Sequence, residues 1–190
     1  MPMIAQRAPA LGDPDTATGG LAALRAGQPD AIALCYEAHA SGLLALAYRL
    51  TGSRDDAEDI VHDVFVGLPQ ALRNYEESGQ FGAWLKRITA RTALMQQRRA
   101  RNRRETPTDV NLIPSVGDAD DDAQRTSVRT RVADALNRLS PPLRAVFVLK
   151  MVEGRTHAEI ATLLGISTGT SEVRLSRAVA QLRSLLGDRT

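Results

Sequence analysis

The segment 154–175 constrains the fold of this chain more than any other part of its sequence. Thr156 and Glu159 form a capping box, because each side chain can bond the backbone N–H of the other residue at the start of a helix. Gly165 then allows the left-handed backbone of a sharp turn, and Ser167 can cap a second helix directly after it. The pattern predicts a helix-turn-helix, whose second helix would enter the major groove of DNA.

Residues 129–190 predict a unit of four short helices with the last pair exposed. The first helix shows apolar residues at helical spacing, and Ser140-Pro141-Pro142 is a cap followed by proline at the start of a second, very apolar helix. This stretch holds ten Lys or Arg against five Asp or Glu, which suits a surface that faces phosphates. Capped helix pairs with a glycine turn also occur in ordinary helical bundles that do not bind DNA. The excess of basic residues therefore favours DNA binding over this alternative.

Composition excludes several classes of site. The 190 residues are 43% apolar, which is enough for one modest core or two small ones. One cysteine, Cys35, excludes an internal disulfide, and the three histidines His39, His62 and His157 are too scattered for a metal site. The sequence shows no nucleophile-base pair and no glycine-rich phosphate loop. We therefore expect no enzyme activity, no catalytic residue, no cofactor, no metal and no small-molecule substrate.

The amino-terminal segment does not have the pattern of a targeting signal. It is rich in Ala, Gly, Pro and Asp and lacks a basic stretch followed by an apolar one, so no signal peptide is expected. No apolar run in the chain is long enough to span a membrane. We predict a cytoplasmic protein with no direct membrane insertion.

An acidic helical segment covers residues 30–82, with nine Asp or Glu against three Arg. A long helix would end at Gly52, and a second helix, capped by Ser53 or Asp55, would follow at once. In the second helix an apolar stripe faces inward, acidic residues lie on the other side, and Pro69 should kink or end it. The acidic face could be merely solvated or could bind a partner.

The charge reverses in a third helix that follows a polar loop over residues 75–82. Between Ala83 and Arg104 there are eight basic residues and no acid, which is typical of a surface that binds a phosphate backbone. A basic tail of this kind could also be only a solubilising end. Residues 105–122 then hold six acids and no base, together with Pro and Gly, which predicts a flexible linker.

These patterns together predict an all-α protein, with two small helical domains joined by a flexible acidic linker. The expected divisions are a disordered segment over 1–29, a helical domain over 30–104, a linker over 105–128 and a helix-turn-helix domain over 129–190.

The order of these parts resembles a bacterial RNA polymerase sigma factor of the sigma-70 family, in the extracytoplasmic-function (ECF) group, with region 2, a linker and region 4. The segment 56–65, Asp-Ala-Glu-Asp-Ile-Val-His-Asp-Val-Phe, resembles the family's docking segment for core RNA polymerase. Residues 84–88, Trp-Leu-Lys-Arg-Ile, followed by Arg98-Arg99, resemble the segment over the minus-ten promoter element. The likeness to region 4 rests on Leu136 and Leu139-Ser140-Pro141-Pro142, Glu159-Ile160-Ala161, Gly169-Thr170, Arg174-Leu175 and Arg177-Ala178.

The resemblance implies a specificity subunit that binds core RNA polymerase and promoter DNA and is controlled by an anti-sigma factor. The residues it implies in core-polymerase binding are Asp56, Glu58, Asp59, His62 and Asp63. Those it implies in recognition and melting of the minus-ten element are Asn74, Tyr75, Gln80, Phe81, Lys86, Arg87, Arg91, Arg98 and Arg99. Those it implies in recognition of the minus-thirty-five element are Arg155, Thr168, Thr170, Ser171, Glu172, Arg174 and Arg177.

Some residues depart from the family pattern. His62 stands where glutamine is usual, Pro69 interrupts a helix that commonly continues, and Met95 replaces a frequent aspartate. Ser171 and Glu172 occupy positions that are often valine and lysine. Because of these departures the promoter sequence cannot be carried over from the family.

Two other functions stay open. One is a conventional helix-turn-helix regulator, which would bind duplex DNA tightly without polymerase. The other is a helical adaptor protein, whose acidic helix binds a partner while the basic segment is incidental. Whether core RNA polymerase competes with the other binding partners of the chain would distinguish a sigma factor, a conventional regulator and an adaptor.

Overall fold

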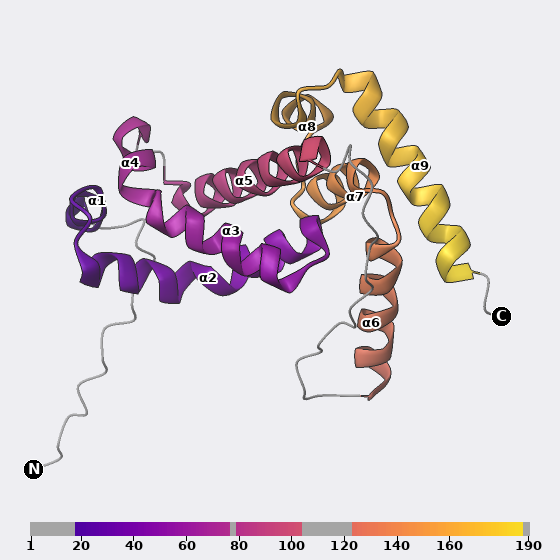
Figure 1. Ribbon diagram of the computed structural model, residues 1–190, viewed down its shortest axis with the longest axis horizontal. Helices are drawn as coiled ribbons and strands as arrows, with labels where there is room; N and C mark the ends of the chain where they lie inside the picture. The colour runs from indigo at the N-terminus through magenta and orange to yellow at the C-terminus, as the bar shows by residue number, and fades with distance from the viewer. Residues whose placement is uncertain (1–17, 77–78, 104–122, 188–190) are drawn as a thin grey trace, which may run out of the picture.

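The computed structural model describes residues 18–76, 79–103 and 123–187, and over these ranges it contains helices and no strand. Figure 1 shows two helical units side by side, one formed by α1–α5 and the other by α6–α9. The prediction of an all-α fold with two helical domains is therefore confirmed. The elements are α1 (Thr18–Arg25), α2 (Pro29–Thr51), α3 (Arg54–Val66), α4 (Leu68–Ala71), the 3-10 turn η2 (Leu72–Asn74), α5 (Phe81–Arg103), α6 (Ala123–Asn137), α7 (Pro141–Phe147), the π-helical turn η3 (Val148–Val152), α8 (His157–Leu164) and α9 (Thr168–Gly187).

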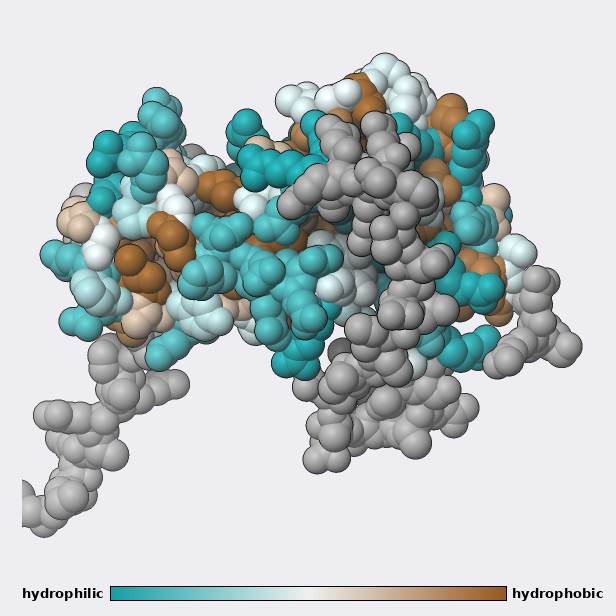
Figure 2. Space-filling model, viewed as in Figure 1, coloured by the Kyte–Doolittle hydropathy of each residue, from teal (hydrophilic) through white to brown (hydrophobic). Residues whose placement is uncertain are grey.

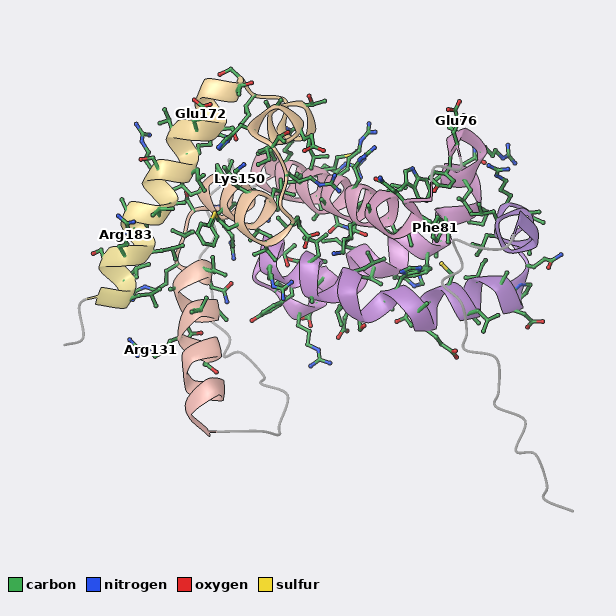
Figure 3. The ribbon with its side chains drawn as sticks, turned by 180° about the vertical axis from the view of Figure 1, so that it is seen from behind. Glu76, Phe81, Arg131, Lys150, Glu172 and Arg183 are labelled. Carbon is green, nitrogen blue, oxygen red and sulfur yellow. The ribbon has the colours of Figure 1, made fainter. Side chains whose placement is uncertain are left out.

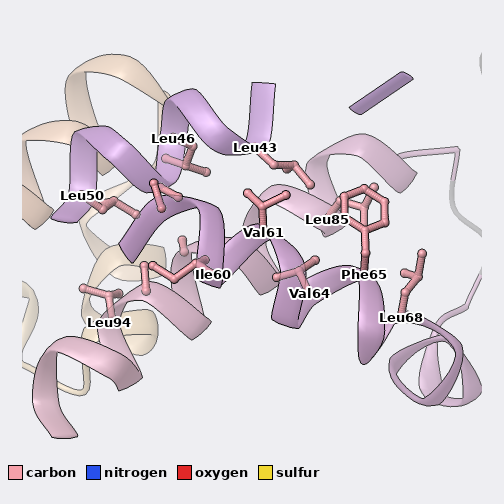
Figure 4. Packing of buried hydrophobic residues seen from close by; sticks show 14 of the residues in the cluster. Leu43, Leu46, Leu50, Ile60, Val61, Val64, Phe65, Leu68, Leu85 and Leu94 are labelled. Atoms are coloured by element: carbon pink, nitrogen blue, oxygen red, sulfur yellow. The ribbon is translucent and has the colours of Figure 1, made fainter. Parts of the chain in front are cut away.

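The first unit is built on three long helices, α2, α3 and α5, which pack against one another. Each helix buries one stripe of aliphatic residues spaced three or four positions apart. Figure 4 shows this core from close by, and Leu46, Ile60 and Leu85 are among its fully buried side chains. Burying one such side chain stabilises the fold by roughly 1.5–3 kcal/mol. The polar face of α3 is thereby left on the surface.

A tight turn joins α2 to α3. Gly52 has a φ of 78°, the left-handed conformation that glycine adopts at low cost, and its N–H donates to the carbonyl oxygen of Tyr48. The Ser53 hydroxyl accepts from the backbone N–H of Asp56 at 3.2 Å, so Ser53 is the cap that α3 uses. α3 ends before Pro69, which lies in the first turn of α4, where its missing N–H costs nothing.

The segment expected to be disordered over residues 1–29 contains a helix, α1. Leu21 and Leu24 of α1 are buried, and Arg25 donates from Nη2 to the carbonyl oxygen of Tyr75 at 2.7 Å. A helix of eight residues is not stable alone in water, so the local sequence could not predict it. α1 is held by packing on α2, α4 and η2. The part of this segment up to residue 17 lies outside the described residues.

The helix α2 corrects the expectation that no apolar run is long enough to span a membrane, because its length and composition would suffice. Cys35, Leu46 and Leu50 of α2 are instead buried in the core of the unit. Packing against α3 and α5 therefore accounts for these buried residues, whereas Leu34 and Tyr36 of the same helix are about half exposed. The same burial raises the pKa of the Cys35 thiol to about 11, so the thiol stays protonated at neutral pH.

The second unit has the four helical segments that the sequence predicted, with η3 continuing α7. Leu136 of α6 and Leu139, just after this helix, form a small cluster with Ala178 and Leu182 of α9. α6 begins at Ala123, inside the predicted 105–128 linker, because the residues that follow the acidic run have ordinary helix propensity. The prediction for residues 105–122 falls outside the described residues.

The two units also share one hydrophobic core. Leu46 and Leu94 of the first unit belong to the same buried cluster as Val146, Leu149 and Ile160 of the second. Nothing in the sequence pattern predicted this contact, because each of these residues also fits the inner stripe of its own helix. The arrangement brings α5 against the segment from η3 to α8, and charged residues of both line the space between them.

Candidate nucleic-acid and protein interfaces

One face of α3 is acidic and exposed. The buried residues of α3 recur on the side that packs on α2 and α5, so the remaining positions point to solvent. Figure 2 shows hydrophilic side chains over this part of the surface. The structure places the whole predicted core-polymerase set here, within about two turns of one helix. Its members, all exposed, are Asp56, Glu58, Asp59, His62 and Asp63.

Two polar contacts border this acidic face. Nε of Arg54 pairs with Oε1 of Glu58 at 2.8 Å, one helical turn away. Nε2 of Gln96, on α5, donates to Oδ2 of Asp63 at 3.2 Å. Because the Arg54–Glu58 pair is exposed, it contributes only about 0.3–0.5 kcal/mol to stability. Neither contact removes the carboxylates from solvent, so the face can still receive a basic partner.

A small hollow opens beside the loop between η2 and α5, with a volume of about 280 Å³. Its wall combines aromatic rings with amide and guanidinium groups, which can stack on and hydrogen-bond an unstacked nucleobase. The lining residues are Asn74, Tyr75, Glu76, Gln80, Ala83, Trp84 and Arg87. The hollow thus brings together four residues of the predicted minus-ten set, Asn74, Tyr75, Gln80 and Arg87.

Phe81 was predicted to contact minus-ten DNA, but its side chain is fully buried. Its ring stacks on Trp84 with centroids 5.7 Å apart and meets Tyr75 and His39 edge-on. Phe81 therefore lies behind the residues that line the hollow, and Figure 3 shows its position near α2. Trp84 is partly buried against the core and also forms part of the wall of the hollow. A tryptophan one turn after a polar loop is the signal that could have identified this position.

Arg25 is a second residue that the sequence analysis missed. From α1 it donates to the carbonyl oxygens of Leu72 and Tyr75, at 3.2 and 2.7 Å. These bonds anchor the backbone at the start of the loop that lines the hollow. No local signal could have identified Arg25, because α1 itself was not predicted.

The basic residues of α5 line a larger cavity of about 840 Å³ between α5 and the second unit. Lys86, Arg87, Arg91 and Arg98 all lie in its wall, together with Met95. The opposite wall comes from η3 and α8 and includes acidic as well as basic side chains, namely Glu153, Arg155 and Glu159. Most of the cations predicted to hold promoter phosphates therefore line this cavity and are still exposed, and Arg99 is exposed outside the cavity lining.

The predicted helix-turn-helix is present in α8 and α9. The Thr156 hydroxyl accepts from the backbone N–H of Glu159 at 3.2 Å, and Oε2 of Glu159 accepts from the backbone N–H of Thr156 at 2.8 Å. Gly165 ends α8 with a φ of 63°, the left-handed conformation expected of a glycine turn. The Ser167 hydroxyl then accepts from the N–H of Thr170 at 3.1 Å and caps α9.

Thr156→Ala is expected to lower the free energy of unfolding by about 1 kcal/mol, because a helix N–H loses its acceptor. Bonds from the Thr156 backbone and hydroxyl lower the pKa of the Glu159 carboxyl. A carboxyl whose pKa is lower when folded stabilises the fold above its unfolded pKa, and this stabilisation is lost as the pH falls through the folded pKa. Urea unfolding should therefore show that Thr156→Ala lowers the free energy of unfolding less at acid pH than at neutral pH.

The matched control for this prediction is Thr162→Ala, which removes an exposed hydroxyl from the middle of the same helix. It should stay within about 0.5 kcal/mol of the wild type. Equal losses in the two variants would contradict the capping role of Thr156.

The start of α9 exposes part of the predicted minus-thirty-five set. Thr168, Glu172 and Arg177 are exposed, and Thr170 and Arg174 are half-buried. Figure 3 places Glu172 near the start of α9. These residues all fall on the first three turns of α9.

Ser171 was predicted to contact DNA, but it is fully buried. Its hydroxyl lies 2.9 Å from Nδ1 of His157, so the pair links α9 to the start of α8. Position 171 falls on the same side of α9 as the buried Ala178 and Leu182, which explains its burial. Val173, which the prediction left out, is instead 50% exposed on the surface of α9. Its methyl groups could contact a thymine methyl.

Arg155 was also predicted to contact minus-thirty-five DNA, but its side chain mainly contacts other parts of the protein. Its side chain is 20% exposed and its Nη1 pairs with Oε1 of Glu159 at 3.3 Å. Its Nη2 donates across the boundary between the units to the carbonyl oxygen of Ala83 at 3.4 Å. In this arrangement Arg155 is a contact between the two units.

Within the described ranges, no group of three or more His, Cys, Asp or Glu side chains could hold a metal ion. The two cavities are lined chiefly by cations, amides, aromatic rings and apolar groups. Such walls suit a nucleic acid better than a cation.

Two family models match this chain. Sigma-70 region 2 matches residues 35–103, and Sigma-70 region 4 matches residues 129–182. The first range holds the acidic face and the hollow, and the second holds the helix-turn-helix.

Curated relatives carry names of the same kind. ECF RNA polymerase sigma factor SigE of Mycolicibacterium smegmatis is 36% identical over 151 residues, which are 78% of this chain and 58% of that protein. RNA polymerase sigma factor CarQ of Myxococcus xanthus is 32% identical over 170 residues, which are 86% of this chain and 94% of that protein. The chain thus spans little more than half of the SigE relative and nearly all of CarQ.

Solved structures give the same likeness. The sigma factor RpoE of Bartonella quintana, in complex with the anti-sigma factor NepR, has a TM-score of 0.58 and 29% identity, covering 79% of this chain and 92% of that one. CnrH, in complex with the cytosolic domain of CnrY, has a TM-score of 0.55 and 27% identity, covering 90% of this chain and 97% of that one.

Proposed function

Because this chain belongs to the extracytoplasmic-function group of RNA polymerase sigma factors in the sigma-70 family, we propose that it binds core RNA polymerase and directs initiation at specific promoters. The observation that carries this proposal is the separation of charge, with an acidic face on α3 and basic surfaces on α5 and α9. The protein would be a dissociable cytoplasmic subunit that performs no chemistry. The polymerase would make all the bonds.

The acidic face of α3 would dock on the coiled coil of the largest polymerase subunit, as the family resemblance implies. Asp56, Glu58, Asp59 and Asp63 would form charge-assisted bonds with basic residues there, and His62 lies among them. The apolar stripe of α3 is already used in the core, so this contact would be mainly polar. Electrostatic attraction of this kind raises the association rate and fixes the orientation of the partners.

The hollow beside the η2–α5 loop would hold one unstacked base of the minus-ten element. Trp84 would offer a ring surface, backed by the buried ring of Tyr75, and Asn74 and Gln80 would bond the edge of the base. Each stacked base contributes about 1–3 kcal/mol to binding of a single strand. The basic residues of α5 would hold the phosphates of the melted strand.

The exposed start of α9 would read the minus-thirty-five element in the major groove. Arg177 and Arg174 could bond guanine or phosphate, and Glu172 could accept from cytosine N4. Val173 would add an apolar contact to thymine. The departures at positions 171 and 172 thus have different consequences, since Ser171 fixes the motif from within and Glu172 faces the groove.

We extend the anti-sigma partnership of the solved relatives to this chain. An anti-sigma factor would have to cover both the acidic face and the helix-turn-helix to prevent initiation.

The direct test is transcription in vitro with purified core polymerase and a library of promoter fragments. Starts at defined sites that depend on this protein would support the proposal and give the promoter sequence. Tight binding to duplex DNA with no such starts would favour the conventional regulator, and binding of a partner protein without DNA would favour the adaptor.

Arg177→Ala should weaken binding of a minus-thirty-five duplex by about 1–3 kcal/mol and relax sequence preference at one position. The matched control is Arg183→Ala, since Arg183 is also exposed but lies further along α9 (Figure 3). Arg183→Ala should weaken binding of the duplex less than Arg177→Ala does, and by the same amount for every sequence. Fluorescence anisotropy with a set of single-base variants of the duplex measures both, and equal profiles for the two variants would contradict base recognition by Arg177.

A further inference from the structure

Arg25, the last residue of α1, binds the backbone at the end of η2 through two bonds. Its Nε donates to the carbonyl oxygen of Leu72 at 3.2 Å, and its Nη2 donates to that of Tyr75 at 2.7 Å. The Leu72 oxygen also accepts from the backbone N–H of Tyr75 at 3.1 Å, so Arg25 uses its second lone pair. Because Nε and Nη2 lie on one edge of a rigid planar group, the two bonds together fix where this backbone lies and how it is oriented.

The helix α1 holds Arg25 itself in a defined place. Leu21 and Leu24 are buried in the main core, and α1 contacts α4 and η2. The turn that follows α1 is tight, because Gly27 has a φ of 70° and its N–H donates to the carbonyl oxygen of Leu24 at 3.0 Å. The backbone of Arg25 is therefore held on both sides, and its side chain carries this order across to η2.

The backbone that Arg25 binds carries part of the wall of the hollow. Asn74, which lies between the two bonded residues, lines the hollow with its side chain. The ring of Tyr75 is only 6% exposed and packs on the ring of Trp84, with centroids 4.6 Å apart. Arg25 is not among the described residues of that wall. A shift of the backbone at Tyr75 would thus displace both the Asn74 amide and the support of Trp84, although Arg25 touches neither.

We propose that Arg25 is a positioning residue for base recognition, and that its two bonds set the geometry with which the hollow selects a minus-ten base. Arg25 acts through the hollow, so the inference rests on the proposed function. Stacking and hydrogen bonds to a base weaken steeply when the groups are misplaced. Phosphate contacts come instead from exposed cations on α5 and depend little on the end of η2. Loss of Arg25 should therefore reduce base selectivity and leave the phosphate-dependent affinity intact.

The test compares the wild type with Arg25→Ala and Arg25→Lys. Lysine keeps the positive charge, but its single ammonium group cannot bond both carbonyl groups in the fixed fork of a guanidinium. The control is Arg49→Ala, which removes the same charge from another exposed position, on α2. Because Arg25 is also exposed, the fold should survive both changes, and thermal melting checks this. Should Arg25→Ala fail to fold, Arg25→Lys carries the test alone.

The probe is a single-stranded oligonucleotide with the non-template sequence of a promoter found in the transcription test above. In a matched series, each minus-ten base in turn is replaced by an abasic site, which keeps the phosphates and removes the base. Fluorescence anisotropy measures the affinity of each strand. Trp84 is the only tryptophan in the chain, so its fluorescence reports directly whether a base enters the hollow.

In the wild type and in Arg49→Ala, removal of the captured base should weaken binding by about tenfold or more, and the intact strand should change the Trp84 fluorescence. In Arg25→Ala and Arg25→Lys the same removal should weaken binding only about two- to threefold, with a smaller change in Trp84 fluorescence. Affinity for the abasic strand should stay within about twofold of the wild type in all variants.

A wild-type base preference in either Arg25 variant would contradict the inference and leave the proposed function intact. Equal loss of affinity for the intact and abasic strands would also contradict it, since a merely structural role predicts that result. If the wild type itself preferred no intact base and showed no change in Trp84 fluorescence, the hollow would not bind a base. The proposed role of the hollow would then be wrong, and the role of Arg25 with it.

Discussion

Reversing the charge of Asp56, Asp59 and Asp63 to lysine is expected to weaken binding of core RNA polymerase at least a hundredfold. The three carboxylates are exposed on one face of α3 and take no part in its buried stripe, so the fold should survive. Placing like charges opposite a basic partner costs several kcal/mol, which far exceeds the loss of one surface ion pair. Surface plasmon resonance with immobilised core enzyme measures the affinity, and circular dichroism checks the helix content.

The control variant reverses three other exposed acids, Asp30, Glu37 and Asp134, and so makes the same change in net charge. It should retain most of the affinity for polymerase. Equal losses of affinity for core polymerase in the two variants would show that total charge, and not the face of α3, is recognised. Unchanged affinity of the α3 variant would show that α3 is not part of the interface.

Phe81→Ala is expected to lower the free energy of unfolding by about 3–5 kcal/mol, the largest effect of a single substitution among our predictions. Phe81 is fully buried, and its ring contacts the rings of His39, Tyr75 and Trp84. Alanine would leave a cavity at the start of α5 and remove these aromatic contacts. In a domain of this size the melting temperature should fall by about 10 °C, which calorimetry can measure.

Two variants bracket this prediction. Phe81→Leu keeps most of the buried volume and should cost no more than about 1.5 kcal/mol. Val66→Ala shortens a side chain that is 67% exposed and should stay within about 0.5 kcal/mol of the wild type. If Phe81→Ala were as stable as Phe81→Leu and Val66→Ala, Phe81 could not support the wall of the hollow. The prediction that Phe81 contacts DNA would then have to be tested directly.

The local signals in the sequence were reliable wherever they depended on neighbours along the chain. Thr156 with Glu159, Gly165 and Ser167 predicted the caps and turn of the helix-turn-helix, and all of these are present. The stripe of α3 likewise predicted its exposed acidic face. Capping bonds and helical periodicity involve residues only three or four positions apart, so the sequence contains everything that determines them.

The same reasoning failed where a side chain is placed by distant parts of the chain. Ser171 and Phe81 are polar or loop-adjacent in sequence but buried in the structure, by His157 and by an aromatic cluster respectively. α1 and its residue Arg25 were missed because a short helix depends on the surface that receives it.

The sequence by itself therefore determined the helices, the turn of the DNA-binding motif and the segregation of acidic and basic faces. Only the tertiary structure decided which of the predicted cations have partners within the protein, because the contact between the units pairs Lys86 with Glu153 and Arg155 with α5. Such a contact joins residues about seventy positions apart through their packing and geometry. Its stability depends on how two complete surfaces fit, and no pattern within either segment contains that information.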